Sequence, residues 1–510
     1  MAARILDFFD ERAHWQRRLW NVGLVLSLRE VLEAGEELGR SLSPAAVRAL
    51  AELVATRVRA DPGAGSDGQK QAIAGYLQQE LDAGGFAHRG IELALRDIEP
   101  RYLDRWQAAL NADGAPGREA TARALASHLL DAGLTPAHLY RWLQALKDAN
   151  EVLPVLDLID EAKQLLAEAP TTHELFVAFE VEPRLRGSRP QEWIDSSTAA
   201  NWLRDYGHEA LQQRGGFRLR FDAKSAEEAV GRAADVIDRF AARVAVGVRS
   251  QLRFSTIAYL ATGEKLALTR GRHVEVRALE RERVVGDLGS GGVVDAALEL
   301  LSHLQQAPAP VAVAGGWSAI ESLLMGPGDE EQPNVIAADR LAALVACSWP
   351  RAELTDLAWA RVRAEDDAFS AAIAAAPSNR EKAIRFAQEV AGTETNPGLK
   401  RGTDIAAQHR VRQLLANPPA HLAAVRGHAS ESLRRLYRQR NLVMHGGRTS
   451  AVALGAALRT AAPLVGAGFD RLVHGSLVKG FEPLELAARA DFELARVQAG
   501  NVEMLVDMLE

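Results

Sequence analysis

The feature that most constrains the fold is the helical spacing of alanine and leucine through most of the chain. These residues recur at that spacing from the start to about residue 170. The pattern returns beyond Ala307-Pro308-Ala309-Pro310, which we interpret as a linker. The sequence therefore predicts a mainly α-helical protein. Beyond the linker, candidate helices begin near Trp317, Val335, Ala352, Arg380, Asp404, Ser430 and Ala451.

The residues between these two helical regions predict a small α+β domain. Phe217-Arg218-Leu219-Arg220-Phe221 alternates apolar and basic residues, which is typical of a half-buried strand. Ser225-Ala226-Glu227-Glu228 is a capping box, in which hydroxyl and carboxylate satisfy free amides, and it opens a helix that should reach about Val246. Further strands are expected at 175–181, 254–260, 265–269 and 273–276. Gly289-Ser290-Gly291-Gly292 lacks the lysine of a nucleotide-binding loop, and we interpret it as a flexible turn.

The length of 510 residues is too great for one ordinary core and suggests about three or four domains. We expect a helical N-terminal domain, the α+β domain, a helical bundle and a C-terminal helical extension. Their predicted ranges are 1–170, 171–306, 311–475 and 476–510.

Charge and cysteine content exclude several classes of protein. The net charge of −7 argues against a protein coated in positive charge for non-specific DNA binding, although the 60 lysines and arginines can form a local basic site. Cys347 is the only cysteine, which excludes an intramolecular disulfide and a multi-thiolate zinc site. Asp7, Asp10 and Glu11 stand where a signal peptide requires an apolar run, and no apolar stretch is long enough to span a membrane. We expect a cytoplasmic protein without a metal or cofactor and without membrane attachment.

The segment from Ser430 to Gly447 carries the strongest chemical signal. Ser430 is a good N-cap, and Gly446-Gly447 should stop the helix just after His445. A helical repeat places four polar residues on one face, and the long side chain of Arg440 can lean over that face. The four residues are Arg434, Arg438, Asn441 and His445.

These residue types suit the cleavage of RNA, which carries its own nucleophile in the 2′-hydroxyl group. Histidine can exchange a proton near neutral pH. Arginine stays charged and holds phosphate oxygens with a planar fork. Asparagine can orient either group by hydrogen bonding, and none of these steps requires a metal.

Arg440-Asn441-x-x-x-His445 resembles the R-x4–6-H motif of HEPN nucleases, including the preferred polar residue after the arginine. That family comprises helical-bundle domains of toxin–antitoxin, abortive-infection and RNA-guided CRISPR systems. The resemblance covers about residues 311 to 475, and the segment from Trp317 to Leu324 is similar to the first helix of a subgroup found in phage-defence proteins.

The resemblance implies a homodimer, formed through the C-terminal domain, that cleaves RNA without metal. His445 would move the proton, Arg440 would stabilise phosphate charge, and Asn441 would orient them. The two N-terminal domains would then sense a trigger, restrain the nuclease or select RNA. The remaining expected roles are those of Arg438 as a further phosphate contact, Glu321 as an acidic support for His445, and Arg434 and Tyr437 as RNA contacts.

Two other functions remain open on the sequence. The first is a non-catalytic HEPN module that binds RNA, nucleotide or a partner protein. The second is a DNA-binding regulator that uses a helix-turn-helix outline around Gly133, with His138 and Arg141 among its exposed positions. The bare spacing of the nuclease motif also occurs at Arg123 to His128, where alanine follows the arginine and no helix stop follows the histidine.

Overall fold

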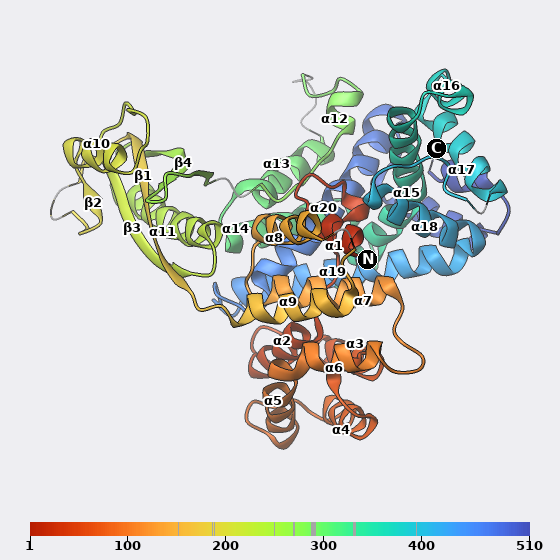
Figure 1. Ribbon diagram of the computed structural model, residues 1–510, viewed down its shortest axis with the longest axis horizontal. Helices are drawn as coiled ribbons and strands as arrows, with labels where there is room; N and C mark the ends of the chain where they lie inside the picture. The colour runs from red at the N-terminus through yellow and green to blue at the C-terminus, as the bar shows by residue number, and fades with distance from the viewer. Residues whose placement is uncertain are drawn as a thin grey trace. The chain divides into compact units, whose positions relative to one another are not determined.

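The structure is a computed structural model that describes residues 1–150, 152–185, 187, 189–248, 250–268, 271–286, 292–329, 333–393 and 395–509. The chain divides into two compact units (Figure 1). The larger unit comprises Met1–Asp131, Val152–Ile159 and Arg272–Glu510, and the smaller unit comprises Ala132–Glu151 and Asp160–Gly271. The prediction of a mainly helical protein with one small sheet is confirmed. The glycine-rich turn predicted at 289–292 lies outside the described residues, except for Gly292, which caps a helix.

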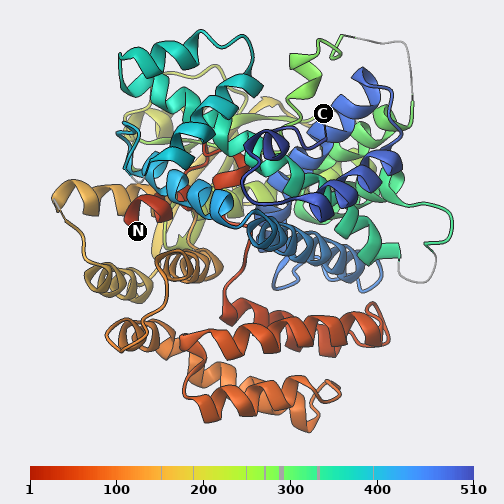
Figure 2. The ribbon, with the colours of Figure 1, turned by 90° about the vertical axis from the view of Figure 1, so that its right-hand side faces the viewer.

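The N-terminal part of the larger unit consists of short helices that pack against one another, and α1 also packs against α18 (Gly402–Ala416) of the C-terminal part. Figure 2 shows α2 and α3 side by side, with α4, α5 and α6 beyond them. Ser43 and Ser66 cap two of these helices through their hydroxyl groups, as the sequence chemistry favours. The elements are α1 (Ala2–Phe9), η1 (Trp15–Arg17), α2 (Leu24–Glu36), α3 (Pro44–Ala60), η2 (Pro62–Ala64), α4 (Asp67–Leu77), α5 (Phe86–Ile98), η3 (Glu99–Arg101), α6 (Tyr102–Leu110) and α7 (Arg118–Asp131).

The C-terminal part of the larger unit is a bundle around α15 and α19, which pack against each other. Both helices are longer than the sequence suggested, and α15 continues through Pro350 because Trp349 and Leu354 are buried on either side of it. The elements are α12 (Ala278–Arg281), α13 (Val293–Gln306), α14 (Ala309–Leu324), α15 (Pro333–Ala364), α16 (Ala368–Ala374), α17 (Asn379–Gly392), α18 (Gly402–Ala416), α19 (Pro418–Met444), α20 (Leu454–Val473), η4 (His474–Val478), α21 (Pro483–Arg496) and α22 (Val502–Val506).

The predicted linker at Ala307 to Pro310 is instead a tight turn between two helices that pack along each other. Helix α14 begins at Ala309, with a proline in its first turn. A Cβ atom at Gly315 would lie only 2.8 Å from the carbonyl oxygen of Leu300, so this glycine permits the close approach of α13 and α14. The strand predicted at 273–276 is also wrong. His273 has a positive φ of 60°, the Val274 N–H donates to the side chain of Gln305, and among the described residues no strand includes this segment.

The smaller unit is built around an antiparallel sheet with the strand order β2-β3-β1-β4-β5. Alternate residues of β1 face opposite sides: Leu175 and Val177 pack under α11, whereas Phe176 and Ala178 pack under α10. The predicted alternation at 217–221 is confirmed, since its apolar residues join the α11 side. The elements are α8 (Pro136–Ala149), β1 (Thr171–Val181), β2 (Trp193–Ile194), α10 (Ser196–Asp205), β3 (Gly216–Ala223), α11 (Ala226–Gly247), β4 (Arg253–Leu260) and β5 (Lys265–Ala267), and α9 (Val155–Ala167) crosses the boundary between the units.

The structure also bears on the helix-turn-helix outline around Gly133 and on membrane attachment. Gly133 has a positive φ of 93° and is flanked by α7 and α8, which belong to different units. Arg141 on α8 pairs with Glu227 on α11. Among the described helices, none has both the length and the apolar character needed to cross a bilayer.

Candidate active site at the end of helix α19

Helix α19 begins well before the predicted start at Ser430. Asn417 caps it by accepting a hydrogen bond from the Ala420 N–H at 3.3 Å, and Pro418 occupies the first turn. The Ser430 hydroxyl therefore lies inside the helix and donates to Asp339 of α15. The first half of the helix, which sequence reasoning left out, anchors the second half in the bundle.

The predicted helix stop is confirmed. Gly447 has a positive φ of 65°, and the N–H groups of Gly447 and Arg448 donate to carbonyl oxygens of the last turn at 3.2 and 3.0 Å. Gly446 approaches the end of α2 closely, since a Cβ atom there would lie 3.0 Å from Ser41 Oγ and 3.2 Å from Glu37 Oε2. The chain thus leaves α19 in a fixed direction, and the site stands beside α2.

Arg440, Asn441 and His445 form one hydrogen-bonded cluster at this helix end. Nη1 of Arg440 donates to Asn441 Oδ1 at 3.0 Å and lies 3.1 Å from His445 Nε2. Because a guanidinium group only donates, Nε2 of His445 accepts, which leaves its proton on Nδ1 in this arrangement. His445 is exposed, Arg440 is half-buried and Asn441 is buried. The buried Asn441 therefore fixes the cluster to the protein interior, and the exposed His445 is accessible to a ligand. The structure therefore brings together the three residues predicted to be catalytic.

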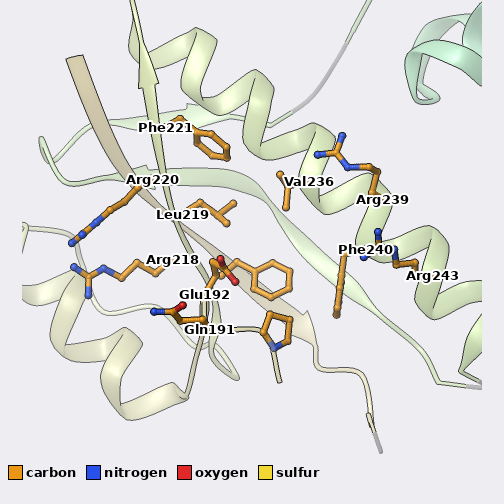
Figure 3. A pocket seen from close by; sticks show the side chains of 12 residues that line it. Gln191, Glu192, Arg218, Leu219, Arg220, Phe221, Val236, Arg239, Phe240 and Arg243 are labelled. Carbon is orange, nitrogen blue, oxygen red and sulfur yellow. The ribbon is translucent and has the colours of Figure 1, made fainter. Parts of the chain in front are cut away.

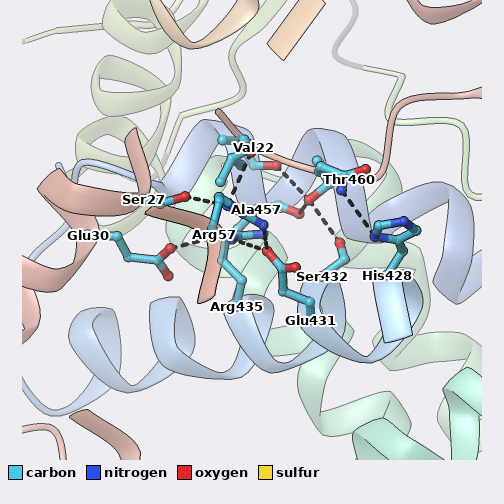
Figure 4. Close-up of polar contacts among 12 residues, drawn as sticks. Val22, Ser27, Glu30, Arg57, His428, Glu431, Ser432, Arg435, Ala457 and Thr460 are labelled. Carbon is cyan, nitrogen blue, oxygen red and sulfur yellow. Dashed lines mark hydrogen bonds and ion pairs between the residues drawn. The ribbon is translucent and has the colours of Figure 1, made fainter. Parts of the chain in front are cut away.

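Arg438, which the sequence suggested as a further phosphate contact, is buried against α2. It is 7% exposed, and its guanidinium group donates to Glu30 Oε1 of α2 at 2.8 and 3.1 Å. Arg435, which sequence reasoning did not single out, donates to the other oxygen of Glu30 at 3.0 Å and to Glu431 (Figure 4). The helical face was predicted correctly, but α2 covers part of it.

The other supporting residues lie apart from the cluster. Arg434 is 39% exposed on its side chain and pairs with Asp339 at 2.7 Å. The ring of Tyr437 packs against buried Trp317 of α14, with 4.9 Å between ring centroids. Glu321 is half-buried on α14, and in the described part of the chain no hydrogen bond or ion pair joins it to Arg440, Asn441 or His445. All three residues are half-buried.

Buried charges explain how α19 is held. Burial alone would raise the pKa of Glu30, but the neighbouring Arg438 and Arg435 outweigh it and hold that pKa below its usual value. Burial likewise opposes ionisation of Glu431, yet Arg57 and Arg435 lower its pKa to about 2. Both carboxylates are therefore ionised at neutral pH, and they connect α2 and α3 to α19 (Figure 4). No local sequence signal marks Glu30 as a partner, because it precedes Arg435 by 405 positions.

The second match to the motif spacing, at Arg123 to His128, does not form such a cluster. Arg123 donates to Glu119 at 2.8 Å and to Asn21 at 2.7 Å. His128 is 9% exposed and stacks on Tyr102, with 4.5 Å between ring centroids. Burial, followed by the positive charge of Arg29, lowers the pKa of His128 to about 4. These residues stabilise the helical core.

We expect His128 to make folding sensitive to mild acid. The folded-state pKa of about 4 lies below the ordinary histidine pKa of 6.5, so only the unfolded chain takes up this proton between those values. Stability should therefore decrease as the pH falls from 6.5 toward 4. His128→Phe retains the stacked ring but removes the titration, and it should reduce the loss between pH 7 and pH 5 by about 2 kcal/mol. Urea unfolding of both proteins at these pH values tests this prediction, and parallel pH dependences would contradict it.

Among the residues that the structure describes, no group of three or more histidine, cysteine, aspartate or glutamate side chains is arranged to hold a metal ion. The chain matches no protein-family model, and comparisons with curated proteins and with solved structures gave no match.

Proposed function

We propose that the unit containing α19 is a metal-independent RNA endonuclease of the HEPN type. The observation that carries this proposal is the contact of Arg440 with both Asn441 and His445 at an accessible helix end. An imidazole beside a fixed guanidinium group supplies a proton carrier and a phosphate ligand at one place. The bacterial setting that we propose, anti-phage defence or a toxin-type system, follows the motif resemblance.

The proposed reaction uses the nucleophile of the RNA itself. His445 accepts the proton of a 2′-hydroxyl group, whose oxygen attacks the adjacent phosphorus. The bond from phosphorus to the 5′-oxygen breaks, the leaving oxygen is protonated, and the products carry a 2′,3′-cyclic phosphate and a 5′-hydroxyl group. Arg440 turns its guanidinium group from His445 toward the phosphate oxygens, and Asn441 holds it in place during that change. A homodimer would supply two such clusters, so that one histidine accepts a proton while the other donates one.

The test is incubation of the purified protein with labelled RNA in excess EDTA, together with analytical ultracentrifugation. The proposal predicts cleavage with 2′,3′-cyclic phosphate ends and a dimer in solution. Intact RNA with a folded dimer would contradict catalysis and favour the alternative, a HEPN-type module that binds RNA, nucleotide or a regulatory partner. The anisotropy of labelled RNA, measured in the same samples, distinguishes an RNA-binding module from one that binds a nucleotide or a regulatory partner.

A further inference from the structure

One edge of the sheet in the smaller unit offers backbone groups for pairing. The strand β2 consists of Trp193–Ile194 and pairs only with Phe217 and Gly216 of β3. Beyond it, the Arg218 N–H donates to the Glu192 carbonyl oxygen at 2.8 Å. Since alternate residues of an antiparallel strand direct their N–H and C=O groups to the same side, Arg220 directs both toward this edge. Within the described residues, no strand pairs with β3 on this side after Phe217.

The open stretch is short and has a defined end. At Asp222 the carbonyl oxygen accepts a hydrogen bond from Arg232 of α11 at 2.9 Å, which closes the edge there. The outward backbone groups left for pairing are thus the Arg218 carbonyl, the N–H and carbonyl of Arg220, and the Asp222 N–H, which is enough to pair with a few residues of a second extended chain. An exposed strand edge is a template for such pairing unless it is blocked.

A groove of about 640 Å³ lies along this edge, between β3, α11 and the residues before β2 (Figure 3). Its floor is apolar, because Leu219 and Phe221 of β3 meet Val236 and Phe240 of α11. These side chains lie on the α11 side of β3, so every second residue of an added strand would face them. The groove is therefore suited to small apolar side chains of an extended segment.

The charges around the groove are mainly positive. Arg239 and Arg243 of α11 are exposed beside the apolar floor, and Arg218 and Arg220 point to the opposite side of β3 (Figure 3). Nε of Arg218 and Nε of Arg220 donate hydrogen bonds to the carboxylate of Glu174 at 2.7 and 2.6 Å, yet the Arg220 side chain remains 64% exposed. Glu174 and Asp222 offset the charges of Arg218 and Arg220 on that side of β3. The excess positive charge therefore lies with Arg239 and Arg243, and acidic residues of an added segment would be favoured where they can reach these two arginines.

We propose that the edge of β3 is a binding site for an extended, acidic peptide segment of a partner protein, which pairs with β3 as an additional strand. This mode of recognition takes affinity from main-chain hydrogen bonds and specificity from the side chains of alternate residues. The apolar floor and the strand edge favour a peptide over a nucleic acid, because nucleotides have no backbone N–H and C=O pattern to match β3. The site is independent of the proposed nuclease, since all of its residues belong to the smaller unit.

The test uses a fluorescein-labelled peptide of nine residues with alternating valine and threonine at its centre and two aspartates at each end, where they can reach Arg239 and Arg243. It is titrated with the full-length protein and followed by anisotropy. We expect saturable binding that the double variant Arg239→Glu/Arg243→Glu weakens about tenfold or more. Arg220→Pro should weaken it as well, because proline removes the outward N–H without removing a bond to β1. A peptide with proline at its centre should also bind more weakly.

The matched control is Arg204→Glu, which reverses an exposed arginine of α10 that does not line the groove. It should change the dissociation constant less than about twofold. The proposal is overturned if the peptide does not bind at millimolar concentration, or if Arg204→Glu weakens binding as much as the groove variants. A single-stranded RNA probe that binds in place of the peptide, and is lost in the groove variants, would also overturn it.

Discussion

Replacing Glu30 with alanine should lower the free energy of unfolding by about 3–5 kcal/mol. Glu30 is 2% exposed and accepts hydrogen bonds from both Arg435 and Arg438. Removal of its carboxylate leaves the buried guanidinium group of Arg438 without its partner and Arg435 with Glu431 alone. The cost is that of an uncompensated buried charge, which is larger than the net contribution of the pair.

Urea unfolding followed by circular dichroism measures this effect, with Glu36→Ala as the matched control. Glu36 lies on the last turn of the same helix and pairs with Arg448, but its side chain is 44% exposed. Its removal should cost less than about 1 kcal/mol, because exposed ion pairs contribute little. Equal losses in the two variants would contradict the central role of Glu30.

A double variant separates charge from packing at this position. Glu30→Ala combined with Arg438→Met removes the carboxylate together with one of the two buried cations. We expect the double variant to be more stable than Glu30→Ala alone, because a buried charge has been replaced by an apolar chain of similar length. A further loss of stability in the double variant would mean that Arg438 contributes through contacts other than Glu30.

The sequence predicted the parts of this protein that local patterns encode. The alternation at 217–221 predicted a half-buried strand, and Gly446-Gly447 predicted the end of α19. It also placed Arg440 close enough to reach His445, because helix geometry fixes the neighbours of each residue within a turn or two. These features depend on contacts between residues that are near each other in the chain.

The features that the sequence did not predict depend on distant pairs. The burial of Arg438 is an example: the helical repeat placed it on the same face as Asn441 and His445, but nothing nearby in the sequence indicated that Glu30 of α2 pairs with it. The start of α19 was placed too late for another reason. Asn417 and Pro418 provide the capping signal, whereas Ser430, a residue type that also favours N-caps, lies inside the helix. Ser430 acts in the bundle through Asp339, which lies 91 positions earlier.

Replacing His445 with alanine should lower the rate of RNA cleavage about 10²- to 10⁴-fold, the usual contribution of a general acid–base group. Arg440→Ala should produce a comparable loss, because no other guanidinium group contacts His445 among the described residues. Arg440→Lys should retain part of the activity, since it keeps the charge but loses the planar fork. These expectations depend on the proposed nuclease, and they are measured as single-turnover rates on labelled RNA in EDTA.

Control variants on α19 and on the adjacent α18 distinguish chemistry from folding. Arg426→Ala removes a half-buried arginine of α19 that pairs with Asp491, and His409→Ala removes an exposed histidine of α18. Both should cleave RNA at nearly the wild-type rate. Because His445 is exposed, His445→Ala should unfold at the same urea concentration as the wild type, within the error of the measurement. An inactive but equally stable His445→Ala, beside active controls, would assign the reaction to the end of α19. A destabilised His445→Ala with unchanged cleavage would show instead that His445 serves the helix end, and that any nuclease activity resides elsewhere.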